Sequence, residues 1–307
     1  MRAVYFLERV AVTGATGFIG SHLVRQLASE ACRLTLISRA QADLTDSNSI
    51  RDILQREKPA TLFHLAGTRG RADARGAQEA CDEINFRATV AVLEAARLAG
   101  VRRIVIAGSA EEYGNQPGPL SESLPSKATT VYGISKARAT AHALEMHARE
   151  GLPVTVVRPF SVYGPGQPRD MFVAEAVDQA VRHADLRMSR GEQKRDLIFV
   201  EDVVRGLVAA ATAEGVEGKI INLGTGQAHR LRDVAERIWE MTAARGRLLI
   251  GARTTAPEEL YDTRADVTLA RRLLGWEART QLESGLRRTI DFAREQLGTK
   301  AQQCQAM

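Results

Sequence analysis

The sequence predicts an α/β fold with a doubly wound parallel sheet and a smaller substrate-binding domain. Short apolar runs alternate with longer segments in which apolar residues recur at the spacing of one helical face. The runs lie at residues 10–12, 33–38, 60–67 and 102–108, and the helical segments at residues 18–27, 77–99 and 132–150. This alternation is typical of parallel strands joined by crossover helices. A glycine-rich turn after the first run is the second observation.

That turn carries glycines at positions 14, 17 and 20, in the run Thr-Gly-Ala-Thr-Gly-Phe-Ile-Gly. Gly14 permits a tight turn, Gly17 lets backbone N–H groups approach a pyrophosphate, and Gly20 lets the following helix pack closely on the strand. The phosphates would then lie at a helix N-terminus. Such spacing also occurs in accidental turns, but the flanking strand and helix favour a Rossmann-type dinucleotide-binding domain. The predicted cofactor contacts in this turn are Gly14, Thr16, Gly17, Phe18, Ile19 and Gly20.

The end of the second strand, Ser38 followed by Arg39, bears on the choice of cofactor. An acidic residue there would bind the adenosine ribose 2′-hydroxyl and select NAD, whereas a small polar residue followed by arginine suits the 2′-phosphate of NADP. A solvated surface arginine is the alternative. Residues 41–44 follow the second strand almost at once, so the next strand of the sheet is expected to be shortened or lost. Asp43 and Leu44 would then approach the adenine of the cofactor. We therefore expect NADPH, with NADH or a tightly bound NAD as alternatives.

The third predicted strand, at residues 60–67, runs into a turn of small residues. The residues of this turn expected near the cofactor are Leu65, Ala66 and Gly67. His64 is interpreted as a core residue, because a histidine inside an apolar run is more often structural than catalytic. Residues 68–76, rich in arginine and glycine, are expected to form a loop beside the site.

Composition narrows the class of protein. The 307 residues, 44% of them hydrophobic, suffice for one large α/β domain and a smaller one. No apolar segment reaches the length of a membrane span and no signal peptide is evident, so a soluble, cytoplasmic protein is expected. The net charge of +5 is spread along the chain, which argues against a nucleic-acid-binding stripe and leaves open a cationic pocket for an anionic small molecule. The three cysteines lack metal-binding spacing, and we assign them no role.

Three polar residues form the predicted catalytic group. Ser109 follows the strand at residues 102–108, at the carboxyl end where open α/β sheets bind their ligands. Tyr132 and Lys136 are four residues apart at the start of a helix, so their side chains share one face. A lysine cation close to the phenol is expected to favour the phenolate and lower the pKa of Tyr132, as proton transfer requires.

These motifs resemble the extended short-chain dehydrogenase/reductases, or NAD-dependent epimerase/dehydratase family, which act on nucleotide sugars. The resemblance covers nearly the whole chain and is carried by residues 13–20, 64–67, Asn85, 108–114, 132–136, 158–166, 195–203, 222–226 and 274–276. It implies that Tyr132 is the acid/base, and that Lys136 holds the nicotinamide ribose and tunes Tyr132. Ser109 would hydrogen-bond the reacting sugar oxygen, and Arg195 would meet the nucleotide diphosphate.

Two departures from the family pattern affect the expected substrate contacts. Ser161 stands where relatives usually have asparagine, and Ala256 stands where relatives often have an arginine that grips phosphate. Arg253 and Arg264 are the candidates to replace that arginine. The candidate substrate contacts are Glu111, Ser161, Arg195 and Arg253, and the resemblance does not identify the nucleotide.

The residues after Ser109 bear on which reaction is catalysed. Relatives that eliminate water carry Asp-Glu at the two positions where this chain has Ala110 and Glu111, which argues against dehydration. The segment at residues 108–114 is similar to that of GDP-4-keto-6-deoxymannose reductases, and Ser38-Arg39 suits an exchangeable NADPH. We expect an NADPH-dependent 4-ketoreductase acting on a nucleotide-linked 4-keto-6-deoxyhexose. An NAD-dependent NDP-hexose 4-epimerase is the first alternative, and a non-catalytic NADP(H)-binding sensor or scaffold is the second.

The chain is expected to divide into a cofactor domain at residues 1–165 and a substrate domain at residues 166–307, with residues 197–225 returning to the sheet. Helices are predicted at residues 171–184, 231–244, 267–274 and 282–297, the last three closing the small domain, and the tail from residue 298 is expected to fray. Because relatives dimerise by pairing two helices, the resemblance implies a homodimer through residues 77–99 and 132–150.

Overall fold

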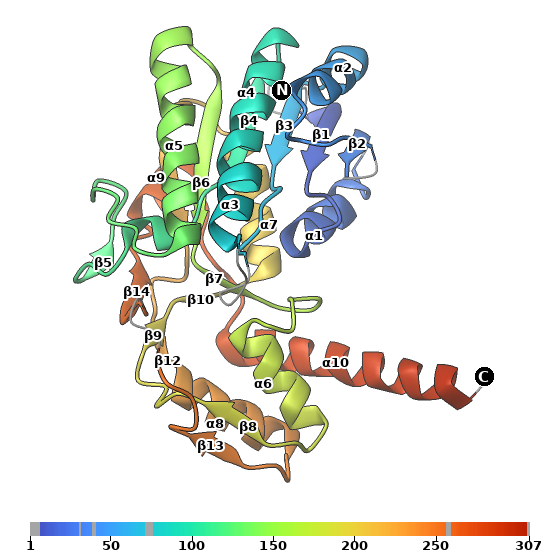
Figure 1. Cartoon of the computed structure of the whole chain (residues 1–307), viewed down its shortest axis with the longest axis vertical. Coiled ribbons are helices and arrows are strands. Elements are labelled where there is room, and N and C mark those ends of the chain that lie inside the picture. Colours follow the sequence, from blue (N-terminus) through green and yellow to red (C-terminus); the bar gives the residue numbers. More distant parts are fainter. Residues whose placement is uncertain (1–6, 31, 39–40, 71–75, 256–258, 306–307) are drawn as a thin grey trace.

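The computed structural model of the chain describes residues 7–30, 32–38, 41–70, 76–255 and 259–305, with side chains through residue 299. Its centre is one sheet of six parallel strands in the order β11-β6-β4-β3-β1-β2 (Figure 1). The strands are β1 (Arg9–Thr13), β2 (Arg33–Ile37), β3 (Thr61–His64), β4 (Arg103–Ala107), β6 (Val154–Pro159) and β11 (Ile220–Leu223). The predicted α/β fold with a parallel sheet is therefore confirmed.

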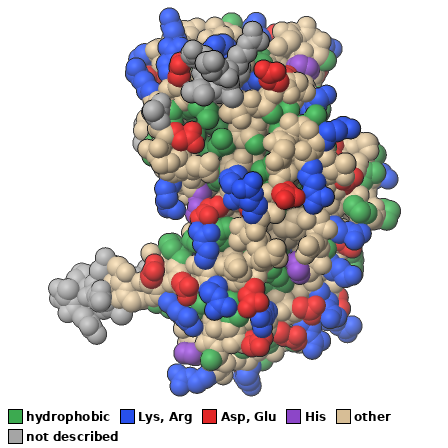
Figure 2. All heavy atoms as spheres, turned by 180° about the vertical axis from the view of Figure 1, so that it is seen from behind, with side chains coloured by type: hydrophobic (Ala, Val, Ile, Leu, Met, Phe, Trp, Pro, Cys, Tyr) green, Lys and Arg blue, Asp and Glu red, His purple; other side chains and the backbone are tan. Residues whose placement is uncertain are grey.

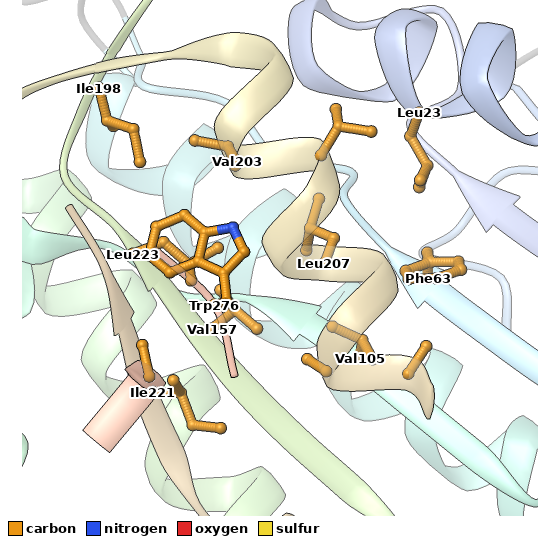
Figure 3. Close-up of a cluster of buried hydrophobic side chains, with 14 of the residues drawn as sticks. Leu23, Phe63, Val105, Val157, Ile198, Val203, Leu207, Ile221, Leu223 and Trp276 are labelled. Carbon is orange, nitrogen blue, oxygen red and sulfur yellow. The ribbon is translucent and has the colours of Figure 1, made fainter. Parts of the chain in front are cut away.

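Helices cover both faces of this sheet because side chains alternate along each strand. Val10 and Val12 pack into the buried cluster that Figure 3 shows in part, whereas Ala11 between them packs on the opposite face. The helices of the first face are α1 (Phe18–Leu27), α7 (Val200–Thr212) and α9 (Thr268–Leu274). Those of the second face are α2 (Ser47–Glu57), α4 (Ala88–Leu98) and α5 (Val131–Glu150). Two apolar layers thus hold the sheet in place.

Strand β1 lies between β2 and β3, so the chain leaves β1 first toward one edge of the sheet and later toward the other. In open α/β sheets the carboxyl ends of the strands at such a reversal form the ligand-binding crevice. Between β2 and β3 the described residues form α2 and no further strand, which confirms the predicted loss of the next strand.

A smaller lobe, below the sheet in Figure 1, has an apolar cluster of its own in which Val177, Ile238 and Leu286 meet. Its elements are α6 (Phe172–Val181), α8 (Leu231–Thr242), α10 (Leu282–Gln305), β8 (Leu186–Met188) and β13 (Leu248–Ile250). The far end of α10 projects sideways from this lobe. The domain division at residue 165 stays a prediction.

Short strands join the two parts. In one pair, β7 (Ser161–Tyr163) runs parallel to β10 (Leu197–Phe199). A four-stranded sheet has the order β12 (His229–Arg230), β9 (Lys194–Arg195), β14 (Asp262–Ala265) and β5 (Pro119–Leu120). Segments far apart in the sequence therefore meet between the large sheet and the smaller lobe.

Within residues 197–225, α7 packs on the large sheet and β11 pairs with β6, as expected, whereas β10 pairs with β7. Two further expectations for the second half of the chain are wrong. α9 packs on the large sheet instead of closing the small lobe, because its Ala270 is buried in the same cluster as α7. The tail expected to fray from residue 298 continues as α10 to Gln305, in a segment that contains the helix-favouring residue types alanine, lysine and glutamine.

Candidate active site

The glycine turn between β1 and α1 is packed too tightly for larger residues. Gly14 has a φ of +69°, and a Cβ atom on it would lie 2.6 Å from the backbone nitrogen of Ala66. A Cβ on Gly20 would lie 2.1 Å from the carbonyl oxygen of Gly14. The end of β3, with Leu65 and Ala66, therefore lies directly against the turn, as the roles predicted for these residues require.

The N-terminus of α1 fits a dinucleotide pyrophosphate. Gly17 is the N-cap residue and provides no side-chain cap, so the first helical N–H groups, at Phe18 and Ile19, have no side-chain acceptor there. Thr16 lies in the turn just before this cap. Backbone donors at a helix N-terminus stabilise phosphate charge. The glycine cradle would accordingly hold the phosphates of NAD or NADP.

The structure describes only some of the residues predicted to select NADP. The backbone N–H of Ser38 donates to Oε1 of Gln41 at 2.9 Å, and Arg39 lies outside the described residues. Oδ1 of Asp43 accepts two hydrogen bonds from Thr45, and Leu44 packs against the apolar layer of α2. The choice between the two cofactors stays a prediction.

Ser109 follows β4 directly and is the N-cap of the short helix η3 (Ala110–Tyr113). Its backbone N–H donates to Oε1 of Glu112 at 2.7 Å, and the other oxygen of Glu112 accepts from Nη2 of Arg158 at 2.6 Å. Both members of this ion pair are buried. The capping box and the ion pair together fix Ser109 at the carboxyl end of the sheet.

Tyr132 and Lys136 lie in the first turns of α5, as predicted. The side chain of Ser109 lies close enough to the Tyr132 hydroxyl to lower the pKa of that phenol. Nζ of Lys136 donates to the carbonyl of Ala107 at 2.8 Å, and a Cβ on Gly67 would lie 3.3 Å from that nitrogen. Burial lowers the pKa of Lys136 to about 8. The structure thus brings Ser109 and Tyr132 together and places Lys136 beside the segment expected to contact the cofactor.

The effect of Lys136 expected on Tyr132 is not found. Burial raises the pKa of Tyr132 to about 12, and the guanidinium of Arg69 is the main charge that opposes this rise. The nearby carboxylate of Glu111 raises the pKa further, and Lys136 is not among the main influences.

Arg69 is a site residue that sequence reasoning missed. Its Cζ lies 4.9 Å from the centroid of the Tyr132 ring, and its Nη2 donates to Oε1 of Glu111 at 2.6 Å. The only signal in the sequence is the arginine-rich loop at residues 68–76, in which spacing does not tell which arginine faces the tyrosine. Of that loop, residues 71–75 lie outside the described residues.

Asn85 lies where the predicted helix at residues 77–99 is interrupted. This helix consists of α3 (Ala77–Cys81), a π-helical turn η2 (Asp82–Arg87) and α4. The side chain of Asn85 accepts from the N–H of Thr68 at 2.8 Å and donates to the Thr68 carbonyl at 2.7 Å. It also donates to Oγ of Ser135 at 2.9 Å. π-Helical turns often occur at functional sites, and this one ties the loop before Arg69 to α5.

Two of the candidate substrate residues, Arg195 and Ser161, lie on different short strands. Arg195 on β9 donates to the carbonyl of Leu260 at 2.5 Å and pairs with Glu259, and it lies close enough to Arg69 and Glu111 to interact with their charges. Ser161 on β7 uses its N–H to bind the Asp196 carbonyl. Arg195 therefore connects the smaller lobe with the charges around Tyr132.

The two candidates for the missing phosphate-binding arginine also differ. Arg253 makes two hydrogen bonds to Glu175, at 2.6 and 3.0 Å, which neutralise its charge. Arg264 on β14 has a buried Nε atom for which the described residues provide no hydrogen-bond partner. A buried unpaired donor is costly, so Arg264 is the better placed to accept an anionic ligand.

Three further observations concern the surface, membrane-spanning helices and metal binding. Figure 2 shows Lys and Arg side chains interspersed with Asp and Glu over one face of the molecule. Among the described helices, none combines the length and apolar character needed to cross a membrane. The described part of the chain also holds no group of three or more His, Cys, Asp or Glu side chains arranged to bind a metal ion.

Comparison with known proteins identifies the family of the chain. Residues 10–224 match the NAD dependent epimerase/dehydratase family. The chain is 31% identical to a UDP-glucose 4-epimerase of Mycolicibacterium smegmatis, covering 93% of this chain and 98% of the relative. It is 30% identical to a UDP-N-acetyl-alpha-D-glucosaminuronate decarboxylase of Bacillus cytotoxicus, covering 94% and 98%.

A solved structure is also similar to this chain over nearly its whole length. The structure of MoeE5 in complex with UDP-glucuronic acid and NAD superposes with a TM-score of 0.84 at 33% identity, covering 94% of this chain and 99% of that one. The glycine turn, the strand-end serine and the Tyr-Lys pair lie in one fold with the arrangement that the motifs predicted. The chain therefore belongs to the NAD-dependent epimerase/dehydratase family, whose members include nucleotide-sugar epimerases, decarboxylases and reductases.

Proposed function

We propose that the chain is an NADPH-dependent 4-ketoreductase of a nucleotide-linked 4-keto-6-deoxyhexose. The observation that carries the reaction class is the approach of the Ser109 side chain to the Tyr132 hydroxyl at the carboxyl end of β4. Two neighbouring hydroxyls can both reach one sugar oxygen. The glycine cradle that suits a dinucleotide lies at the same end of the sheet.

Each residue of the site has a role in this reaction. A bound nicotinamide cofactor would supply the hydride that reduces the C4 carbonyl. Oη of Tyr132 gives its proton to the sugar oxygen O4, and Oγ of Ser109 donates a hydrogen bond to that same oxygen. Lys136 and Gly67 line the cofactor side. Tyr132, whose pKa burial raises to about 12, is a neutral phenol at neutral pH, which is the form that a proton donor needs.

Glu111 is unsuited to the acid/base chemistry of water elimination. One oxygen of its carboxylate accepts from Arg69, and the other accepts from Oγ1 of Thr130 at 2.8 Å. Both oxygens of Glu111 are therefore engaged by neighbouring side chains, which gives this carboxylate a structural role. This supports reduction over dehydration, in agreement with Ala110 at the preceding position.

The short connection between β2 and α2 favours a reductase over an epimerase. The described residues of this connection, Ser38 and residues 41–46, include the half-buried Ser38 and the exposed Asp43 and form no further strand. A reductase must exchange its cofactor at every turnover, and we propose that this short connection allows the exchange. Arg195 and Arg264 are proposed to hold the diphosphate. The homodimer and the cytoplasmic location stay predictions.

An NAD-dependent 4-epimerase is the second candidate. It is supported by the similarity to the UDP-glucose 4-epimerase and to MoeE5, whose structure contains NAD. The same residues would serve both reactions, but in the epimerase Tyr132 would first accept the proton of the sugar 4-hydroxyl and later return it, whereas in the reductase it only donates a proton. The two candidates differ in whether the cofactor leaves after each turnover.

The test is turnover of the purified protein with added NADPH on a panel of nucleotide-linked 4-keto-6-deoxyhexoses. The expected result is loss of NADPH absorbance at 340 nm with one equivalent of reduced sugar formed. Retention of NAD through purification, with interconversion of UDP-hexoses and no added cofactor, would instead establish the epimerase. Binding of NADPH with no turnover on either panel would leave the non-catalytic sensor as the function.

A further inference from the structure

We propose that Arg69 is a positioning residue for Tyr132, and that its guanidinium over the phenol ring supplies the positive charge that the family resemblance assigns to Lys136. Arg69 lies in the loop after β3, and its Cζ is 4.9 Å from the ring centroid. The proposal rests on the proposed function in one respect, namely that Tyr132 transfers the proton. It applies equally to the reductase and to the epimerase.

The side chain of Arg69 is held in place through η3 and the cap of α5. Its Nη2 donates to Glu111, whose second oxygen accepts from Thr130. Thr130 is the N-cap of α5 and accepts the N–H of Gly133 at 2.9 Å. A Cβ on Gly133 would lie 2.6 Å from the carbonyl oxygen of Glu111, so η3 and the first turn of α5 are in close contact. The guanidinium is thus linked to the helical turn that carries Tyr132.

The backbone before Arg69 is held by a second route. Asn85 binds both the N–H and the carbonyl of Thr68 and donates to Oγ of Ser135. Oγ of Ser135 in turn donates to the backbone carbonyl of Tyr132 at 2.8 Å. Two separate hydrogen-bond paths therefore join the loop to the same turn of α5. This double linkage keeps a half-exposed arginine over the phenol.

The charged and titratable groups around this site come from several elements. They are Arg69 after β3, Cys81 of α3, Glu111 and Glu112 of η3, Lys136 of α5, Asp170 before α6 and Arg195 of β9. Glu112 is compensated by its buried partner Arg158. Arg69 and Glu111 are therefore the two charges with opposite effects on the pKa of Tyr132, Arg69 lowering it and Glu111 raising it.

The cation acts when the phenol gives up its proton. Loss of that proton leaves negative charge on Tyr132, and a positive group already in place stabilises this charge without reorganisation. Arg69 is about half exposed, so solvent screens part of the effect. We therefore expect a single charge at this distance to change the pKa of Tyr132 by about 1 unit.

The experiment is an ultraviolet difference titration of the phenol in five proteins without substrate, with Tyr132→Phe as the blank. Glu111→Gln is expected to lower the pKa of Tyr132 by about 1 unit, and Arg69→Gln is expected to raise it, so that the phenol does not ionise while the protein stays folded. The double variant is expected to return near the wild-type value. Arg69→Lys, which keeps the charge, is expected to recover most of the shift, and circular dichroism checks that each variant is folded.

Opposite pKa shifts in the two single variants, with recovery in the double variant, support the proposal. If Arg69 had only a structural role, its loss would not shift the pKa of Tyr132 in the direction opposite to the loss of Glu111. Equal shifts in both single variants, or no shift in Arg69→Gln, would overturn it. If Glu111→Gln fails to fold, the comparison of Arg69→Gln with Arg69→Lys decides the question alone. Because the titration needs no substrate, a shift without turnover on any sugar nucleotide would refute the proposed function and leave the role of Arg69 intact.

Discussion

At the scale of single residues, the acid of the proposed reaction is the hydroxyl of Tyr132. Tyr132→Phe keeps the ring under Arg69 and removes only the proton donor. We expect kcat to fall about 100- to 10,000-fold, the usual contribution of general acid catalysis. Steady-state kinetics with a 4-keto sugar nucleotide measure this loss.

Two controls accompany that variant. NADPH binding, followed by its fluorescence, should remain close to the wild-type value because the phenol oxygen is not needed for the phosphates. Ser109→Ala should lose less activity, since it removes one hydrogen bond to the reacting oxygen. Full turnover by Tyr132→Phe would contradict the site assignment.

His64 gives a second prediction at this scale, concerning stability in acid. It is buried in β3, where Nδ1 lies 2.7 Å from Oγ1 of Thr13 and Nε2 lies 2.9 Å from Oγ1 of Thr89, which confirms the prediction of a core histidine. Burial, followed by the charge of Lys136, lowers its pKa to about 3. Below its ordinary pKa of about 6.5, the unfolded chain binds a proton that the folded chain does not.

The stability contributed by neutral His64 is therefore complete above pH 6.5 and is lost as the pH falls from 6.5 toward 3. We expect His64→Gln to have a weaker dependence of its unfolding free energy on pH in this range, by up to about 1.4 kcal/mol per pH unit. Urea unfolding at pH 7, 6, 5 and 4 measures both slopes. Identical slopes in the two proteins would show that His64 takes up its proton in the folded state.

At the scale of elements, the junction of β1 and α1 depends on direct backbone packing. A methyl group at Gly20 would lie 2.1 Å from the Gly14 carbonyl oxygen, so α1 would have to move away from the turn. Gly20→Ala is expected to weaken dinucleotide binding at least tenfold and to destabilise the fold, although alanine is the better helix former by about 1 kcal/mol. Fluorescence titration with NADPH and urea unfolding test both effects.

Gly298 provides the matched control for this substitution. It lies in α10, is exposed, and has nothing within 4 Å of the position that a Cβ would take. Gly298→Ala should therefore follow helix propensity alone and stabilise the protein by up to about 1 kcal/mol, with no change in cofactor binding. Tolerance of Gly20→Ala comparable with that of Gly298→Ala would mean that the turn relaxes easily.

At the scale of the whole molecule, α4 and α5 lie side by side on one face of the sheet and provide the surface for the predicted homodimer. Val131 and Ile134 of α5 are exposed large apolar residues three positions apart, and Ile134 is 45% exposed. We expect light scattering at micromolar concentration to give a particle of twice the 33.5 kDa chain mass. An isologous contact of two helices from each subunit would bury these side chains.

Ile134→Arg is expected to shift this particle toward the monomer, because charge at the centre of an interface is costly. Ile250→Arg is the control, since Ile250 is 37% exposed on β13 in the smaller lobe, away from α4 and α5. A wild-type particle of 33.5 kDa would reject the dimer. Equal effects of the two variants would place the interface elsewhere.

The sequence by itself determined the features that depend on local geometry. The turn at Gly14 and Gly20 was predictable because its steric requirement follows from spacing within one strand and one helix. Tyr132 and Lys136 share a helical face because they are four residues apart, and the parallel sheet follows from alternating apolar runs. Ser109 was identified because the carboxyl end of a parallel strand is a known location for ligands.

Only the tertiary structure decided the features that depend on distant contacts. Arg69 meets Glu111 across 42 positions of sequence and lies over Tyr132, and no periodicity distinguishes it from its neighbouring arginines. The positions of α9 and β10 depended on which surface of the large sheet was still free. The pKa of Tyr132 depended on burial and on the charges of Arg69 and Glu111. Such properties depend on interactions among residues that are remote in sequence. The pattern of residues along a chain indicates only the interactions within one helix or strand.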